Sequence, residues 1–373
     1  MYIQRSYLNN FQTVLQKQSF YPKIVDFGEN NVEPQIIADS VNNCGLAVSC
    51  VEILGSFLNG DGFLEDIGNI ECNKNGDTLN DILSFCAEQT ALFNGFALHF
   101  DYNPFLQITE ITPVQYQFCR KSFPFGKVAV WDNWAGESPK INNFYGNIEW
   151  FSEYKHGEAA YDVRKKFESF DDFDGQVGLF GYRKNGATYP LSPIRPILKD
   201  VQSYAVQANF RYRAAKNNFS ATKIIEYVGD MTAEQRKNLQ KQVSEFMGDE
   251  NAGSVMILNG GFRDDNGNFQ SALSIKDVDI ASVDRLFEVQ HEQIQTNISR
   301  AFRIPLELFS LNQNKGLNSG GETLKSAYTA YNNFTQKQRN WLASELSPIL
   351  SNFLGYQTNA GIKPLIFNNY EIL

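Results

Sequence analysis

The sequence predicts an α+β fold in which a mixed first half precedes two long amphipathic helices. Apolar residues recur at helical spacing over residues 282–302 and again over 323–353. Short runs rich in Ile, Val, Phe and Tyr between residues 96 and 131 are typical of strands. A segment with strand, helix and turn signals separates the 282–302 helix from an earlier helix at 191–216.

The composition is that of a chain with a substantial core. Its 373 residues are 42% hydrophobic and exceed one typical domain, so we expect two or three packing units. No run reaches the roughly 18 apolar residues that span a bilayer. Because residues 1–19 are polar and lack a signal-type apolar stretch, we expect a cytoplasmic chain with no membrane partner.

Neither the cysteines nor the net charge indicates a common functional class. The cysteine count is odd and no pair has CxxC spacing, so we expect buried small side chains and not a disulfide framework or a zinc site. These residues are Cys44, Cys50, Cys72, Cys86 and Cys119. A net charge of −9 speaks against a tight nucleic-acid binder, because such affinity comes largely from neutralised phosphates, but it permits a conduit.

The first half is expected to hold two helices followed by strands. Residues 36–57 keep one apolar stripe, which predicts a single helix. A second helix is expected at 78–93, capped by Asp77 or Thr78, and Gly95 should break it before a strand.

A basic helix and a small α/β segment follow. Ser192 is the expected N-cap of that helix and Pro193 its first residue. Thr232 and Gln235 have the spacing of a capping box, and Asn-Gly at 266–267 predicts a hairpin turn. Strands are expected at 224–228, 254–258 and 269–275.

The two long helices have the clearest periodicity. The apolar stripe of the first consists of Val283, Leu286, Phe287, Ile294, Ile298, Ala301 and Phe302. Its opposite face carries Arg285, Glu288, Glu292, Gln295 and Ser299. Pro305 disfavours helical geometry at Ile304, so this helix should kink or stop there. Pro348 is expected to kink or restart the last helix, whose apolar side is Leu324, Ala327, Tyr331, Phe334, Gln338, Trp341, Leu342, Leu346 and Leu350.

The sequence offers little support for catalysis. Its three histidines form no HxH or HExxH pattern, and we expect His99 to pack within a strand and His291 to be solvated. Phosphate-binding glycine loops, a calcium loop and a nucleophile elbow are also absent from the sequence. We therefore expect no cofactor, no metal and no enzymatic activity. Because paired carboxylates can lie far apart in sequence, a carboxylate-dependent hydrolase stays an alternative.

The order of these parts from residue 189 to 354 resembles the HK97-type portal proteins of tailed bacteriophages. Residues 191–193 resemble the start of that family's first stem helix, and residues 231–235 with 253–258 resemble its clip. Residues 301–309 (AFRIPLELF) are similar to the kink after its second stem helix. The resemblance implies these boundaries: 1–190 wing, 191–216 first stem helix, 217–279 clip, 280–304 second stem helix, 305–322 kink and tunnel loop, and 323–373 crown or wing helix and tail.

The same resemblance implies a virion protein, assembled in the host cytoplasm, that forms a ring of twelve subunits at one capsid vertex. Such a ring is a channel for DNA packaging and ejection, contacts double-stranded DNA without regard to sequence, and meets the terminase large subunit, the head–tail adaptor and the major capsid protein. The kink would lie at Ile304 and Pro305. The expected DNA-channel residues are Asn312, Gln313, Asn314 and Lys315 at the constriction, and Arg211, Arg213, Lys216, Glu288, Glu292 and Gln295 on the stem wall.

Another head–tail connector or tail protein is the second alternative. A side-by-side hairpin of the helices at 191–216 and 282–302, with 217–279 at its tip, would favour the portal over both alternatives.

Overall fold

The structure is a computed structural model of the chain. It describes residues 24–28, 31–134, 148–158, 162, 164–165, 173–182, 187–216, 223–227, 234, 237–238, 261–263, 269–271, 273–277, 281–309 and 320–366. The chain divides into two compact units, Met1–Val201 with Asn297–Leu373, and Gln202–Thr296. The combination of helices and a mixed sheet confirms the predicted α+β class.

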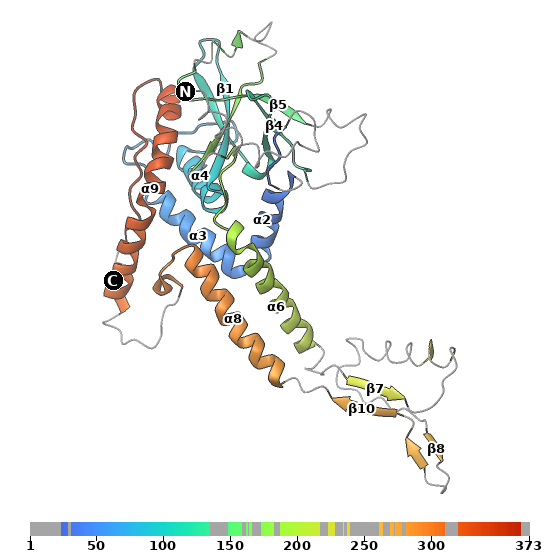
Figure 1. Ribbon diagram of the computed structural model, residues 1–373. Coiled ribbons are helices and arrows are strands. Elements are labelled where there is room, and N and C mark those ends of the chain that lie inside the picture. The colour runs from blue at the N-terminus through green and yellow to red at the C-terminus, as the bar shows by residue number, and fades with distance from the viewer. Residues whose placement is uncertain are drawn as a thin grey trace, which may run out of the picture. The chain divides into compact units, whose positions relative to one another are not determined.

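The first unit is built on a six-stranded sheet with the order β2-β1-β6-β5-β4-β3 (Figure 1). The strands are β1 Gly95–Tyr102, β2 Ile108–Val114, β3 Cys119–Lys121, β4 Lys127–Val130, β5 Glu149–Glu153 and β6 Gln176–Gly181. Neighbouring strands are antiparallel except β5 and β6. β1 is fully buried from Phe96 to Leu98, as expected of a strand with neighbours on both sides.

Residues 36–57 form two helices and not the single helix that their periodicity predicted. α2 (Glu33–Asn42) and α3 (Gly45–Asn59) meet at 105°. The backbone N–H and the side-chain amide of Asn43 both donate to the carbonyl oxygen of Asp39, and Cys44 is extended (φ −129°, ψ 97°). Asparagine favours the end of a helix because its side chain competes for backbone groups.

α4 (Leu79–Phe93) begins with a capping box. The Thr78 hydroxyl accepts from the Asp81 N–H at 3.3 Å, and Asp81 Oδ2 accepts from the Thr78 N–H at 2.8 Å, which confirms Thr78 as the cap. Left-handed Asn94 (φ 56°) ends the helix, so Gly95 is not the helix breaker. Gly95 instead starts β1, where an added Cβ would lie 2.6 Å from the carbonyl oxygen of Phe180.

α9 (Gly320–Leu354) is a single helix that starts three residues earlier than predicted, and Pro348 lies inside it. Most of the predicted apolar side is buried or half-buried, but Phe334 is 42% exposed. Two polar residues that were not predicted, Thr335 and Arg339, are buried on this helix. Arg339 Nη1 donates to the carbonyl oxygen of Phe57 at 3.1 Å, which ties α9 to the end of α3.

A buried arginine lies where β3 meets the start of α2. Arg120 is fully buried, and its guanidinium donates to Asn31 Oδ1, to Asn31 O at 2.7 Å and to Gln35 Oε1 at 3.1 Å. Its carbon Cζ lies 5.5 Å and 5.0 Å from the ring centroids of Phe27 and Trp134. Burial lowers the pKa of Arg120 to about 10. Hydrogen bonds to neutral oxygens and aromatic faces thus compensate for the loss of hydration.

Helices α6 (Leu198–Lys216) and α8 (Ala281–Ala301) contribute most of their length to the second unit, with strands β7 (Lys223–Tyr227), β8 (Gly261–Arg263), β9 (Phe269–Ser271) and β10 (Leu273–Asp277). β8 pairs antiparallel with β9 across the predicted turn, but the first strand of this hairpin is Gly261–Arg263 and not 254–258. The predicted strand 269–275 is divided between β9 and β10, and β10 pairs with β7. The turn itself at 266–267, Thr232, Gln235 and residues 254–258 lie outside the described residues.

The five cysteines are free and buried, as predicted. Burial raises the pKa of Cys50, Cys72 and Cys119 to about 12. Within the described residues no single helix has the length and apolar character to cross a membrane, although the bent α2–α3 pair meets that criterion jointly.

Replacing Arg120 with methionine should lower the free energy of unfolding by about 3 kcal/mol or more, because the oxygens of Asn31 and Gln35 would stay buried without their donor. Urea unfolding followed by circular dichroism measures the loss. Arg195→Met is the matched control, since the Arg195 side chain is 46% exposed and its loss breaks one 3.3 Å ion pair, with Glu33, instead of several buried hydrogen bonds. Equal losses in the two variants would contradict this account of Arg120.

Candidate functional site

The part of the predicted site that the structure describes is the pair of helices α6 and α8, which lie side by side (Figure 1). Tyr204 and Gln207 of α6 both contact His291 of α8, and Asp200 Oδ2 lies 3.3 Å from Asn297 Nδ2. Because rising residue numbers on α6 meet falling numbers on α8, the two helices are antiparallel. The predicted first helix therefore forms the expected hairpin, but it starts at Leu198, after a 3-10 turn at Arg195–Ile197.

Two strands continue this pairing in the chain that leaves α6 and returns to α8. β7 and β10 are antiparallel, with Lys223 opposite Asp277 and Tyr227 opposite Leu273. The outgoing and returning chains are therefore held together by backbone hydrogen bonds beyond the helices.

Tyr204 and Gln207 of α6 contact His291 of α8, and His291 in turn contacts Gln295 of its own helix. We call these four residues the polar seam. The His291 ring stacks on Tyr204 with a centroid distance of 4.9 Å. Its Nδ1 lies 3.3 Å from Gln207 Oε1, and its Nε2 lies 3.1 Å from Gln295 Nε2. Since an amide oxygen accepts and an amide nitrogen donates, this geometry needs a neutral imidazole with its proton on Nδ1.

The surroundings of His291 also favour the neutral ring. Burial lowers its pKa below the ordinary value of 6.5, the positive charge of Arg211 lowers the pKa further, and Glu292 opposes both effects. The prediction that His291 is simply solvated is therefore wrong. The repeat Tyr204, Gln207, Arg211 at helical spacing was the available signal for this face.

The structure places the predicted channel residues in three groups. Arg211 and Glu292 are exposed, and Gln295 is half-buried in the polar seam. Arg213, Lys216 and Glu288 lie on α6 and α8, but their side chains lie outside the description. The constriction residues Asn312 to Lys315 also lie outside the described residues. On the predicted polar face of α8, Ser299 is buried, contrary to expectation.

At the predicted kink, α8 stops. Arg303 is left-handed (φ 55°), its N–H donates to Arg300 O at 3.0 Å, and the Ile304 N–H donates to Ser299 O at 3.3 Å. This pair of bonds is a Schellman motif, which satisfies carbonyl groups at a helix end. Ile304 is buried, and Pro305 follows before the 3-10 turn Leu306–Leu308. Of the two expected outcomes, a kink or a stop, the structure shows the stop.

α9 holds this helix end in place. The Tyr331 hydroxyl donates to the carbonyl oxygen of Phe302 at 3.2 Å. Arg303 Cζ lies 4.8 Å from the ring centroid of Phe334, a cation–π contact that covers part of this exposed ring. Neither Arg303 nor Phe334 was predicted to act here, because a left-handed arginine has no sequence signature comparable to glycine.

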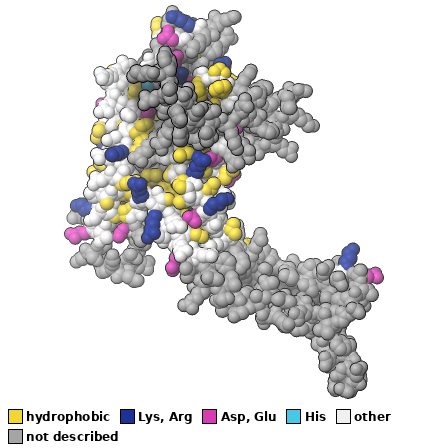
Figure 2. All heavy atoms as spheres, in the orientation of Figure 1, with side chains coloured by type: hydrophobic (Ala, Val, Ile, Leu, Met, Phe, Trp, Pro, Cys, Tyr) yellow, Lys and Arg dark blue, Asp and Glu magenta, His cyan; other side chains and the backbone are white. Residues whose placement is uncertain are grey.

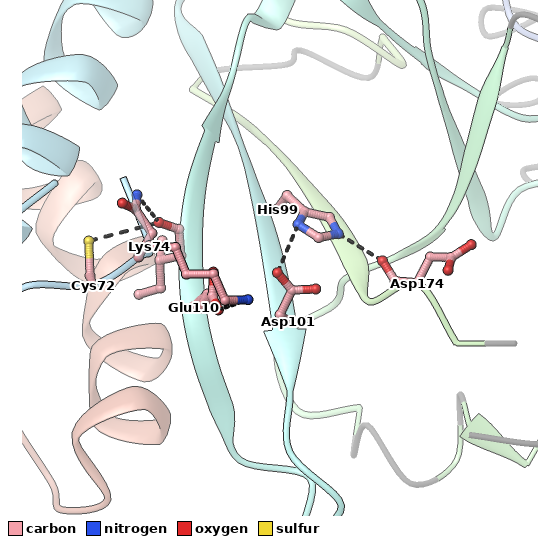
Figure 3. A network of polar contacts seen from close by, with 8 residues as sticks. Cys72, Lys74, His99, Asp101, Glu110 and Asp174 are labelled. Atoms are coloured by element: carbon pink, nitrogen blue, oxygen red, sulfur yellow. Dashed lines mark hydrogen bonds and ion pairs between the residues drawn. The ribbon is translucent and has the colours of Figure 1, made fainter. Parts of the chain in front are cut away.

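His99 is packed within β1, as predicted (Figure 3). Its Nε2 lies 2.8 Å from the carbonyl oxygen of Asp174, so this nitrogen is the donor. Its Nδ1 lies 3.7 Å from Asp101 Oδ2, and its ring meets Phe151 edge-on at 4.9 Å. Both nitrogens therefore face groups of the protein itself.

Cys72 and Lys74 lie beside β2 in the same view (Figure 3). Burial raises the pKa of the Cys72 thiol to about 12, which disfavours the nucleophilic thiolate. Lys74 Nζ lies 2.5 Å from Glu110 Oε1. In the part of the chain that the structure describes, no three His, Cys, Asp or Glu side chains converge to hold a metal ion.

Solved structures of similar fold come from gene transfer agent (GTA) particles. A chain in the virion of a native GTA particle matches with a TM-score of 0.50 and 14% identity, over 98% of this chain and 90% of that chain. A chain in the neck of a native GTA particle computed with C12 symmetry matches with a TM-score of 0.50 and 13% identity, over 97% and 90%. An HK97 family phage portal protein from Corynebacterium diphtheriae matches with a TM-score of 0.43 and 11% identity, over 78% and 83%.

The predicted resemblance is confirmed as far as a likeness of fold to chains of the virion and neck of GTA particles. The two GTA chains carry this conclusion, and at 13–14% identity they speak for the fold alone. No protein family model and no curated protein matches the sequence.

Titration of the His291 ring by NMR should give a pKa below 6.5. Arg211→Gln should raise this pKa, and Glu292→Gln should lower it. Because the pKa in the folded state is depressed, the contribution of His291 to stability is present above about pH 6.5 and is lost as pH falls toward the folded-state pKa. An unchanged pKa in both variants would show that neither charge acts on the ring.

The Arg303→Gly variant should be more stable to unfolding than the Arg303→Ala variant by about 1 kcal/mol. Both substitutions remove the guanidinium, but only glycine adopts a left-handed conformation without strain. Thermal unfolding of Arg303→Gly and Arg303→Ala measures the difference. If the alanine variant were the more stable one, the helix end would not have the described geometry.

Proposed function

We propose that this chain is a portal protein, of which twelve copies form a ring at a capsid vertex that conducts double-stranded DNA during packaging and ejection. The observation that carries the proposal is the antiparallel α6–α8 hairpin, continued by β7 and β10. The fold likeness over nearly the whole chain to virion and neck chains of GTA particles supports it, and the C12 symmetry of one of these structures supports the number twelve.

In this proposal the hairpin is the stem, residues 217–279 are the clip, residues 1–190 are the wing, and α9 is the crown or wing helix. Subunits close the ring by head-to-tail contacts between two different faces. The ring meets phosphates and not base edges, so its contact with DNA does not depend on sequence. The constriction is formed by Asn312, Gln313, Asn314 and Lys315, and the stem wall by Arg211, Arg213, Lys216, Glu288, Glu292 and Gln295.

The chain acts as a conduit and not as an enzyme. Packaging energy comes from a separate ATPase, the terminase large subunit, which docks on the clip and is later replaced by the head–tail adaptor. The major capsid protein surrounds the ring in the virion. Assembly takes place in the host cytoplasm.

A different connector in the neck is the second candidate, favoured by the likeness to a chain of a GTA neck. Negative-stain images and the mass in solution distinguish the two functions only in part, so the position in the particle is the decisive observation. A portal is bound to the capsid vertex and is required before DNA enters, whereas another connector joins after packaging.

Replacing Asn312–Lys315 by Gly-Ser-Gly-Ser should leave the ring intact and reduce DNA packaging or retention, because the constriction loses three amide side chains and the charge of Lys315. Light scattering and negative-stain images of the purified chain measure the ring, and DNA protected from nuclease in particles measures retention. The control replaces only the exposed Lys74 and Asn75 by Gly-Ser and keeps Asn73, whose side chain holds that turn. Normal DNA retention in the first variant would contradict the assignment of Asn312–Lys315 to the constriction.

A further inference from the structure

One corner of the sheet exposes a pair of aromatic rings on a rigid turn. Phe123 and Phe125, in the turn between β3 and β4, are 60% and 53% exposed, and their rings meet edge-on at 6.2 Å. The Ser122 hydroxyl donates to Pro124 O at 2.7 Å and accepts from the Lys127 N–H at 3.0 Å. The exposure of the two rings is therefore built into a braced turn.

A second corner of the sheet also exposes an aromatic ring on a hydrogen-bonded turn. Phe105, in the turn between β1 and β2, is 90% exposed, and Asn103 Oδ1 accepts from the N–H groups of Phe105 at 3.0 Å and Gln107 at 3.1 Å. The Gln107 side chain reaches Phe353 O at the end of α9 at 3.3 Å. Tyr356, just beyond that helix end, is 53% exposed.

The two corners lie at opposite edges of the sheet, because β2 and β3 are its outermost strands. The two turns, one joining β1 to β2 and the other β3 to β4, are four strand spacings of about 4.8 Å apart, or about 19 Å. The aromatic sets therefore cannot cover each other within one chain. Charges of opposite sign are exposed beside them. Lys127 is exposed next to the first corner, and at the second the side chain of Asp101 is 45% exposed while Lys74 is already paired with Glu110.

We infer that a second copy of this chain covers these corners: the Phe123–Phe125 turn of one subunit packs on Phe105 and Tyr356 of the next. The inference rests on the proposed ring. Two different surfaces that fit each other give a head-to-tail contact, which repeats from subunit to subunit until the ring closes. Aromatic rings on rigid turns suit such an interface because they bury a large area with little loss of conformational freedom. Lys127 opposite Asp101 fixes the orientation.

Cysteine cross-linking of the full chain tests this contact. The five native cysteines are buried, so they compete little with introduced thiols. Under oxidising conditions, a mixture of Phe125→Cys and Phe105→Cys chains should yield a cross-linked dimer, and the double variant should yield a ladder that ends at the ring. The matched control uses Leu191→Cys in place of Phe105→Cys. Leu191 is also exposed, but it lies beside Asn94 at the start of β1, whereas Phe105 follows the end of that strand.

A second measurement keeps the test independent of disulfide formation. The double variant Phe123→Ser with Phe125→Ser should raise the concentration at which the chain assembles by at least about tenfold, while its circular dichroism stays that of the native fold. Rings that form normally without the 105–125 cross-link, or with equal cross-linking at 191, would overturn this contact and leave the proposed function standing. A chain that stays monomeric and uncross-linked at every concentration would overturn both.

Discussion

Two helix ends depend on one helix, α9, for the hydrogen bonds that they cannot make themselves. The last carbonyl groups of a helix have no partner within it. Arg339 donates to Phe57 O at the end of α3, and Tyr331 donates to Phe302 O at the end of α8. The ring of Tyr331 also meets that of Phe57 edge-on at 4.7 Å. The inner face of α9 therefore carries donors among its apolar residues, and the removal of either donor would leave a helix end unsatisfied in the core.

Buried polar groups need partners that are often distant in sequence, and this explains which parts of the fold the sequence could predict. Strand-rich segments, the capped helix at 79–93 and the long helix α9 follow from periodicity and capping, which are local. Buried polar residues such as Arg120 and Arg339 have partners about 90 and 280 positions away, and local periodicity carries no information on such pairs. The break at Asn43 was missed for a different reason, since the apolar spacing continues across it and only the side-chain bond to Asp39 O reveals it.

At the candidate site, the stop at Pro305 was predictable because proline acts on its own neighbours. The left-handed Arg303 that precedes it was not, since arginine at such a position is retained by its surroundings: the Schellman bonds on one side and the Phe334 ring on the other. The polar seam was missed because His291 was judged from the polar face of α8 alone. Its role depends on Tyr204 and Gln207, which come from the other helix of the hairpin.

The polar seam adds directed contacts to the apolar residues that α6 and α8 bury, which include Val201, Ile294 and Ile298. Hydrophobic contacts have no directional requirement. The hydrogen bonds of the polar seam, in contrast, form only when each donor faces its acceptor and His291 is neutral. Hydrogen bonds between named side chains thus help to specify the register of α6 on α8. Val206 of α6, at 67% exposure, takes no part in this packing. The helices also carry charges of both signs, with Arg211 exposed on α6 and Glu292 exposed on α8. Affinity for DNA rises with each phosphate that a protein neutralises. In the proposed channel, acidic residues among the basic ones would therefore weaken the hold of the stem helices on DNA.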